Sequence, residues 1–148
     1  MKSISSSEVL TMLPQKYPFV FIDKILDYKE GEYAVGEWLA KENEWYFVGH
    51  YPDYPVLPGI LQAEAIGQCA SFALLTMDKF QGGGKDIFLL EYQVKLHNKV
   101  FPGNLLMMKT YIDKVKGAVA EYHGEAYVND TLVSFARFKA LIMKSSLL

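Results

Sequence analysis

The sequence has few of the residues that would support disulfide, metal or long-range electrostatic chemistry. It contains one cysteine, Cys69, so no internal disulfide can form and the chain fits a reducing compartment. Its three histidines lie far apart, and no histidine or cysteine pair has the spacing of a metal site. The formal net charge of −2 gives no general attraction to nucleic acid or anionic lipid. We therefore expect neither a metal ion nor a nucleic-acid partner.

Long hydrophobic runs are missing as well. The N-terminal segment lacks the apolar core of a secretory signal, and no run elsewhere is long enough to cross a bilayer. The motifs of P-loop, dinucleotide-binding and nucleophile-elbow proteins are absent, and the tract at residues 82–85 is typical of a plain loop. We interpret the chain as a soluble, cytoplasmic protein that makes no membrane contact.

The sequence is instead rich in apolar residues. Hydrophobic residues make up 51% of it and aromatic residues 14%. This apolar fraction is ample for the core of one domain of 148 residues, and it is high for a small monomeric protein. We predict a single domain, residues 1–148, that hides part of its apolar surface in a homo-oligomer.

Hydrophobic patterning predicts an α+β chain. Residues 5–13 indicate a short helix, because Ser5 and Glu8 have capping-box spacing. Residues 57–77 are apolar nearly all round, which predicts a long, buried helix with Pro58 in its first turn. The connections between the predicted strands are short, so an antiparallel sheet must curl around that helix. The predicted strands cover residues 19–28, 33–40, 86–96, 104–115, 118–128 and 131–143.

The strongest functional signal is the segment FVGHYPDYPVLPGILQAE, residues 47–64. His50 is followed by prolines at every third position, Pro52, Pro55 and Pro58. Each proline fixes its own φ and restricts the residue before it, so the loop can hold an imidazole in a set place. Neutral histidine is the usual general base near physiological pH. The plain alternative is a histidine whose bonds are satisfied within a loop.

Three further residues of this region can complete an acid–base site. Glu64 is a carboxylate in an apolar helix, where desolvation raises the pKa and suits it to general-acid catalysis. Gln68, one turn later on the same face, could orient it. Gly59 opens the helix, where free backbone N–H groups attract a negative oxygen. A base, an acid and an oxyanion donor can together remove a proton beside a carbonyl and expel a β-hydroxyl. The plain alternative for Glu64 is a place on a solvated stripe of the helix. For Gly59 it is an ordinary glycine at the start of a helix.

Longer motifs extend this pattern. The stretches LPQKYPFVFIDKIL, FVGHYPDYPVLPGILQAEAIGQ and VKLHNKVFPGNLL resemble the (3R)-hydroxyacyl-[acyl carrier protein] dehydratases of the FabA/FabZ family, and the resemblance covers nearly the whole chain. It implies the hotdog fold, a long central helix wrapped by an antiparallel sheet. It also implies dehydration of a (3R)-3-hydroxyacyl chain to a trans-2-enoyl chain, in fatty-acid or related polyene or polyketide synthesis. The implied partner is acyl carrier protein with its phosphopantetheine thioester, and no cofactor is implied.

The resemblance also implies a role for each site residue. His50 corresponds to the catalytic histidine, Glu64 to the catalytic acid, and Gly59 to the glycine whose N–H holds the thioester carbonyl. Gln68 would support Glu64. Such enzymes are homodimers, often trimers of dimers, and each active site takes histidine from one subunit and glutamate from the other. The FabZ branch carries Glu where the isomerising FabA branch carries Asp, so dehydration alone is predicted.

Some positions depart from the family pattern. LHNK at residues 96–99 replaces a basic F-R-R-P, which weakens the expected surface for an acidic carrier protein. Two alternatives therefore stay open. The same fold hosts acyl thioesterases, which would release a free thiol from the same substrate. The chain could also be a partner-dependent, non-catalytic subunit of a heteromeric dehydratase.

Overall fold

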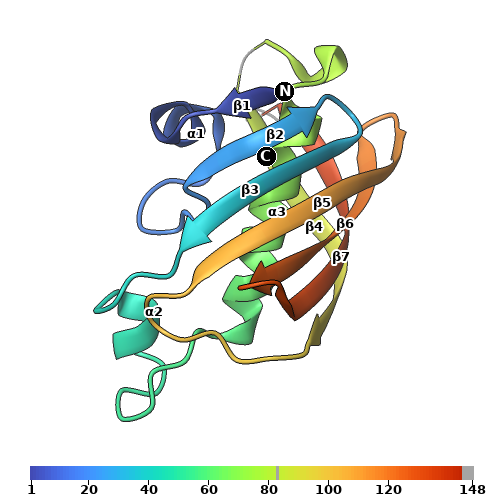
Figure 1. Ribbon diagram of the computed structural model, residues 1–148. Coiled ribbons are helices and arrows are strands. Elements are labelled where there is room, and N and C mark those ends of the chain that lie inside the picture. The colour runs from blue at the N-terminus through green and yellow to red at the C-terminus, as the bar shows by residue number, and fades with distance from the viewer. Residues whose placement is uncertain (83, 145–148) are drawn as a thin grey trace.

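The centre of the computed structural model, which describes residues 1–82 and 84–144, is the helix α3 (Gly59–Leu75) (Figure 1). Twelve of its residues are buried, because a helix that is apolar on every face needs a cover on every face. The long, buried helix is thus confirmed. It begins two residues later than predicted, because Pro58 takes an extended conformation (ψ 131°) and serves as the N-cap instead of lying in the first turn.

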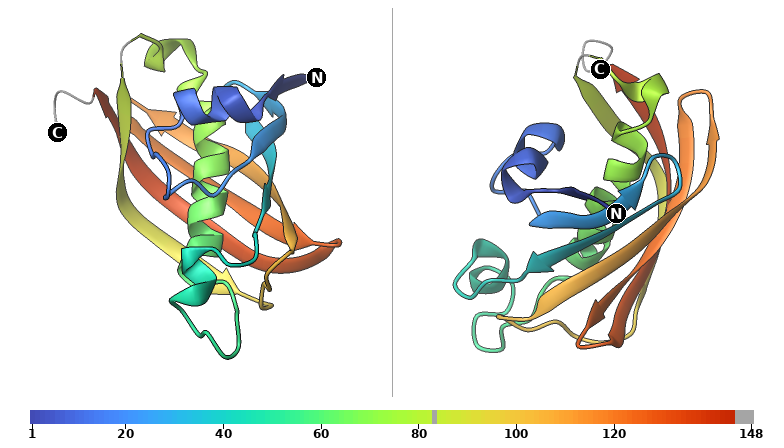
Figure 2. Two further views of the ribbon diagram at one scale, coloured as in Figure 1. Left: turned by 90° about the vertical axis from the view of Figure 1, so that its left-hand side faces the viewer. Right: turned by 45° about the horizontal axis from the view of Figure 1, so that its top comes forward.

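A seven-stranded sheet wraps this helix, with the order β1-β2-β3-β5-β6-β7-β4 and only antiparallel neighbours in the described part of the chain. Figure 2 shows the sheet curving so that α3 lies in its concave face. The predicted α+β hotdog arrangement is confirmed. The strands are β1 (Lys2–Ile4), β2 (Lys24–Lys29), β3 (Tyr33–Leu39), β4 (Lys85–Leu96), β5 (Leu105–Lys116), β6 (Val119–Val128) and β7 (Thr131–Lys144).

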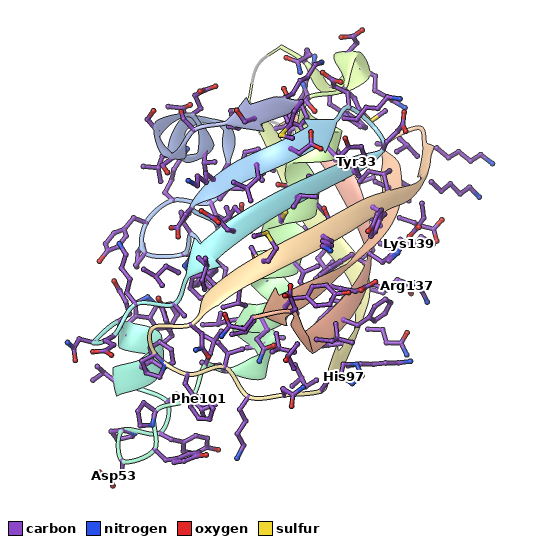
Figure 3. The ribbon with its side chains drawn as sticks, in the orientation of Figure 1. Tyr33, Asp53, His97, Phe101, Arg137 and Lys139 are labelled. Atoms are coloured by element: carbon purple, nitrogen blue, oxygen red, sulfur yellow. The ribbon has the colours of Figure 1, made fainter. Side chains whose placement is uncertain are left out.

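The two faces of the sheet have different chemistry. On the concave side of β6, a Cβ built on Gly124 would lie 2.7 Å from Ile66 of α3, so the absence of a side chain lets helix and sheet approach closely. On the outer face, Arg137 and Lys139 of β7 extend away from the helix (Figure 3). Lys139 stands in register with Glu121 of β6. One face therefore builds the core and the other faces water, as expected for an antiparallel sheet.

Several local elements differ from the sequence-based expectation. The short helix α1 (Ser6–Met12) is confirmed together with its capping box, whereas β1 was not predicted. The strand expected at residues 19–28 begins only at Lys24. Before it, Phe21 is fully buried, but its N–H donates to the side chain of Gln68 and not to a neighbouring strand. The helix α2 (Trp45–Val48) and the 3₁₀ turn η1 (Asp78–Phe80) were also missed, because both are too short for a periodic pattern.

Candidate active site

His50 lies in the loop that joins α2 to α3, and its ring is fixed from one side. Its Nδ1 is 2.9 Å from the carbonyl oxygen of Val56. A carbonyl can only accept, so Nδ1 carries the proton and donates. In the neutral imidazole, Nε2 then has the free lone pair that a general base requires. The ring also packs against Tyr51, with the two ring centroids 4.2 Å apart.

The proline-rich loop is tied to the connection between β4 and β5. The N–H of Leu57 donates to the carbonyl of Val100 at 2.8 Å. Near the tip, Tyr54 packs edge-on against Phe101, and the ammonium of Lys99 lies 5.0 Å from the centre of the Tyr54 ring. In Figure 3, Asp53 and Phe101 lie at the same end of the molecule. These contacts, together with the prolines, hold the loop that carries His50.

Glu64 faces a largely apolar environment in the middle of α3. Burial raises the pKa of its carboxyl above the ordinary value, and the hydrogen bond from Gln68 opposes this by stabilising the ionised form. Gln68 donates from Nε2 to Oε2 of Glu64 at 2.9 Å. The structure therefore brings together the two helix residues that the sequence paired, one turn apart.

The orientation of Gln68 is set by the backbone of the segment before β2. Its Oε1 accepts from the N–H of Phe21 at 2.8 Å, and its Nε2 also donates to the carbonyl of Phe19 at 3.1 Å. Because the Phe21 amide can only donate, the Gln68 oxygen must face it and the nitrogen must face Glu64. The amide of Gln68 thus presents a donor to the carboxylate of Glu64.

Gly59 is the first residue of α3, and the helix has no side-chain cap. The N–H groups of Leu61 and Gln62 both donate to the carbonyl of Pro58, at 2.9 and 3.4 Å. Within the described residues, the N–H groups of Gly59 and Ile60 have no protein acceptor. Two donors at the positive end of a long helix are therefore available to a ligand oxygen.

The single chain does not join all the predicted residues. Glu64 and Gln68 are hydrogen bonded, but in the described part of the chain no hydrogen bond links His50 to Glu64. Tyr122 of β6 was not among the predicted site residues. Its buried ring stacks on Phe138, with the ring centroids 5.1 Å apart. Burial raises the pKa of the Tyr122 hydroxyl, and so does the nearby charge of Glu64. Tyr122 is an inward-facing position of a correctly predicted strand, but its proximity to Glu64 depends on the fold.

Other parts of the molecule offer different chemistry. A cavity of about 560 Å³ on the outer face contains none of the predicted site residues. Across residues 1–82 and 84–144, no group of three or more histidine, cysteine, aspartate or glutamate residues could hold a metal ion. No described helix is both long and apolar enough to span a membrane. The cavity is lined by Glu91, Tyr92, Gln93, Asp113, Lys114, Glu121, Arg137, Phe138 and Lys139.

The fold belongs to the hotdog class. It is similar to the dehydratase heterocomplex ApeI:P from Xenorhabdus doucetiae, with a TM-score of 0.77 and 15% identity, over 93% of this chain and 92% of that chain. It is also similar to a thioesterase-superfamily protein from Thermus thermophilus, with a TM-score of 0.62 and 18% identity, over 82% and 88% of the two chains. At such identities the likeness concerns the fold alone, and the two neighbours carry names of different classes.

The sequence comparison is more specific. Residues 13–137 match the model of the FabA-like domain. The chain is 40% identical, over 128 residues, to a protein of Moorella thermoacetica named 3-hydroxyacyl-[acyl-carrier-protein] dehydratase FabZ, which covers 83% of this chain and 85% of that protein. A protein of the same name from Clostridium botulinum is 33% identical over 148 residues, covering 97% and 99%. The chain therefore belongs to the FabA-like family, as its motifs predicted.

Proposed function

We propose that this protein is a 3-hydroxyacyl-[acyl-carrier-protein] dehydratase, built as one hotdog domain. One observation carries the proposal. The carboxyl of Glu64 has its pKa raised by burial and is oriented by Gln68. A raised pKa favours the protonated form of this carboxyl, and a proton donor is what the departure of a hydroxyl group needs. The FabZ dehydratases that share most of the chain support the same reaction.

In the proposed reaction, His50 is the base and Glu64 is the acid. His50 Nε2 removes a proton from C2 of a (3R)-3-hydroxyacyl thioester, and charge develops on the thioester oxygen. The N–H of Gly59 stabilises that charge at the start of α3. Glu64 gives its proton to the C3 hydroxyl, the C3–O bond breaks, and the products are a trans-2-enoyl thioester and water. Transfer of the proton from His50 back to Glu64 restores the starting state.

The proposed enzyme is a homodimer that shares its active sites. β4 is an edge strand, and it exposes apolar side chains that water does not favour. Pairing of two β4 edges would cover these side chains and bring a second copy to the side of α3 that carries Glu64. His50 of one subunit would then act with Glu64 of the other, and three such dimers could form a hexamer. The exposed apolar residues of β4 are Phe88, Leu89, Leu90, Tyr92 and Leu96.

The proposed partner is acyl carrier protein, in the cytoplasm, presenting the acyl chain on its phosphopantetheine arm. The relatives carry this substrate in their names. Lys99 provides positive charge beside the proline-rich loop, where an acidic carrier could approach, and Lys95, over the ring of Phe135, adds a second positive charge on β4. The arm would deliver the thioester to the N–H groups of Gly59 and Ile60.

The proposal is tested by following two products at once. Purified protein is given 3-hydroxyacyl thioesters of several lengths, on carrier protein and on coenzyme A, and enoyl absorbance and free thiol are recorded. We expect enoyl formation without thiol release, and loss of enoyl formation in both His50→Ala and Glu64→Gln. Thiol release would favour a thioesterase. If neither signal appeared, the partner-dependent subunit would become the better explanation.

A further inference from the structure

The side chain of Leu96, the last residue of β4, lies directly against Gly59. A Cβ built on Gly59 would be 2.2 Å from Cδ1 of Leu96 and 3.2 Å from Cδ2. Real Cβ atoms do not approach other atoms as closely as the first distance, so the leucine occupies the space that a side chain at residue 59 would need. Leu96 therefore forms one wall of the space at the start of α3.

The backbone around Leu96 is fixed while its side chain is not enclosed. Leu96 pairs with Ser134 of β7. The N–H groups of the next two residues, His97 and Asn98, both donate to the carbonyl of Val133, at 2.9 and 3.1 Å. In the single chain the residue is 56% exposed, and the proposed dimer would cover it. A substitution at residue 96 should therefore change the local space and leave the strand in place.

The first turn of α3 is linked to the same segment. Gln62, one turn after Gly59, is 2% exposed, and its Nε2 donates to the carbonyl of Asn98 at 3.4 Å. The helix start and the chain after Leu96 are thus held together. The position of Leu96 relative to Gly59 is held by two contacts, the β4–β7 pairing and this bond.

A thioester bound at Gly59 must share this space with Leu96. A carbonyl oxygen that accepts from the Gly59 N–H lies about 2.9 Å from that nitrogen. Leu96 Cδ1 occupies the Cβ position of the same residue, so we expect C2, the one carbon bonded to the thioester carbonyl, to lie beside the Leu96 methyl groups. We propose that Leu96 is a specificity-determining residue, which limits the room at C2 of the acyl chain and so selects chains without a C2 substituent. This inference rests on the proposed dehydratase function.

The test compares two substrates that differ by one methyl group. The kcat/KM values are measured for 3-hydroxybutyryl-pantetheine and for both C2 epimers of 2-methyl-3-hydroxybutyryl-pantetheine. In Leu96→Ala we expect the ratio of methylated to unmethylated substrate to rise by about tenfold, the low end of what one methyl group decides in an apolar pocket. In Leu96→Phe we expect the ratio to fall. The control is Leu105→Ala, an exposed leucine of β5 that should leave the ratio unchanged.

The outcomes separate the inference from the function on which it rests. If the variants turn over the unmethylated substrate but both keep the wild-type ratio, the role of Leu96 is refuted. A change in KM that is equal for the methylated and the unmethylated substrate would also refute it. Leu96 would then contact the pantetheine sulfur, which the two substrates share. If the wild type forms no enoyl product from the unmethylated substrate, the proposed function fails, and this inference fails with it. Light scattering and thermal unfolding confirm that each variant is folded.

Discussion

Gln68 is buried in α3 and bonds to three partners, Glu64, Phe19 and Phe21. Its oxygen and nitrogen are assigned without ambiguity, because the Phe21 N–H can only donate and the Phe19 carbonyl can only accept. The same logic fixes the proton of His50 on Nδ1. At the scale of single residues, the backbone therefore decides which atom Gln68 presents to Glu64 and which ring nitrogen of His50 faces away from the Val56 carbonyl.

Replacing Gln68 by leucine removes all three bonds at once. The buried N–H of Phe21 and the carbonyl of Phe19 would lose this partner, so Gln68→Leu should lower the free energy of unfolding by about 1–3 kcal/mol. Urea denaturation measures this change. The matched control is Gln93→Leu, an exposed glutamine of β4, for which we expect less than about 0.5 kcal/mol. Equal effects in the two variants would contradict the role assigned to Gln68.

Glu64 should make stability depend on pH. Its folded-state pKa lies above the ordinary carboxyl value of 4.5, so the folded state holds the proton more tightly than the unfolded state. The stabilisation is complete below pH 4.5 and is lost as pH rises through the folded-state pKa. Relative to Glu64→Gln, the wild type should therefore become less stable over this interval. Urea unfolding of both proteins across pH measures the difference, and a constant difference would show that burial does not perturb Glu64.

At the scale of elements, the sequence predicted what is local and missed what is long-range. The helix α3, its apolar surface and the pair Glu64–Gln68 follow from residues one turn apart. The loop before β2 was read as strand because FVFID alternates like one, yet its partner is a glutamine 47 residues away in sequence. The contact of Leu96 with Gly59 has no local signal either. The contact depends on the pairing of β4 with β7. Of the strands that follow β4, β7 is the farthest from it in sequence.

The seam between α3 and β6 offers a test of this packing. A Cβ on Gly124 would lie 2.7 Å from both Ile66 Cγ2 and Thr110 Cγ2, and 3.0 Å from the Lys109 carbonyl oxygen. Since backbone cannot yield as a side-chain tip can, Gly124→Ala should lower the free energy of unfolding by about 1–3 kcal/mol. The comparison is Gly67→Ala in α3, where the nearest atoms are 3.3 Å away and belong to a ring. Thermal or urea unfolding should show the larger loss for Gly124→Ala, and the reverse order would contradict the described seam.

At the scale of the whole molecule, the two exposed parts of the sheet have opposite character. A row of alternating charge crosses the outer face in register, from Glu91 through Lys139 and Glu121 to Lys114. Such a row is stable in water and gives no reason to bury this face. The edge strand β4 instead exposes a series of apolar side chains. In the proposed dimer, a second copy at this edge would cover them, and His50 of one subunit would act with Glu64 of the other.

The central claim, that His50 of one subunit acts with Glu64 of the other, is tested most directly by mixing two inactive variants. His50→Ala and Glu64→Gln are refolded together from denaturant in equal amounts, and enoyl formation is compared with each variant refolded alone. Half of the resulting dimers are mixed, and each mixed dimer holds one intact site. The account therefore predicts recovery of about a quarter of the wild-type activity. If the mixture stays as inactive as its components while light scattering shows dimers, the two residues do not act across the subunit boundary, and the account is wrong.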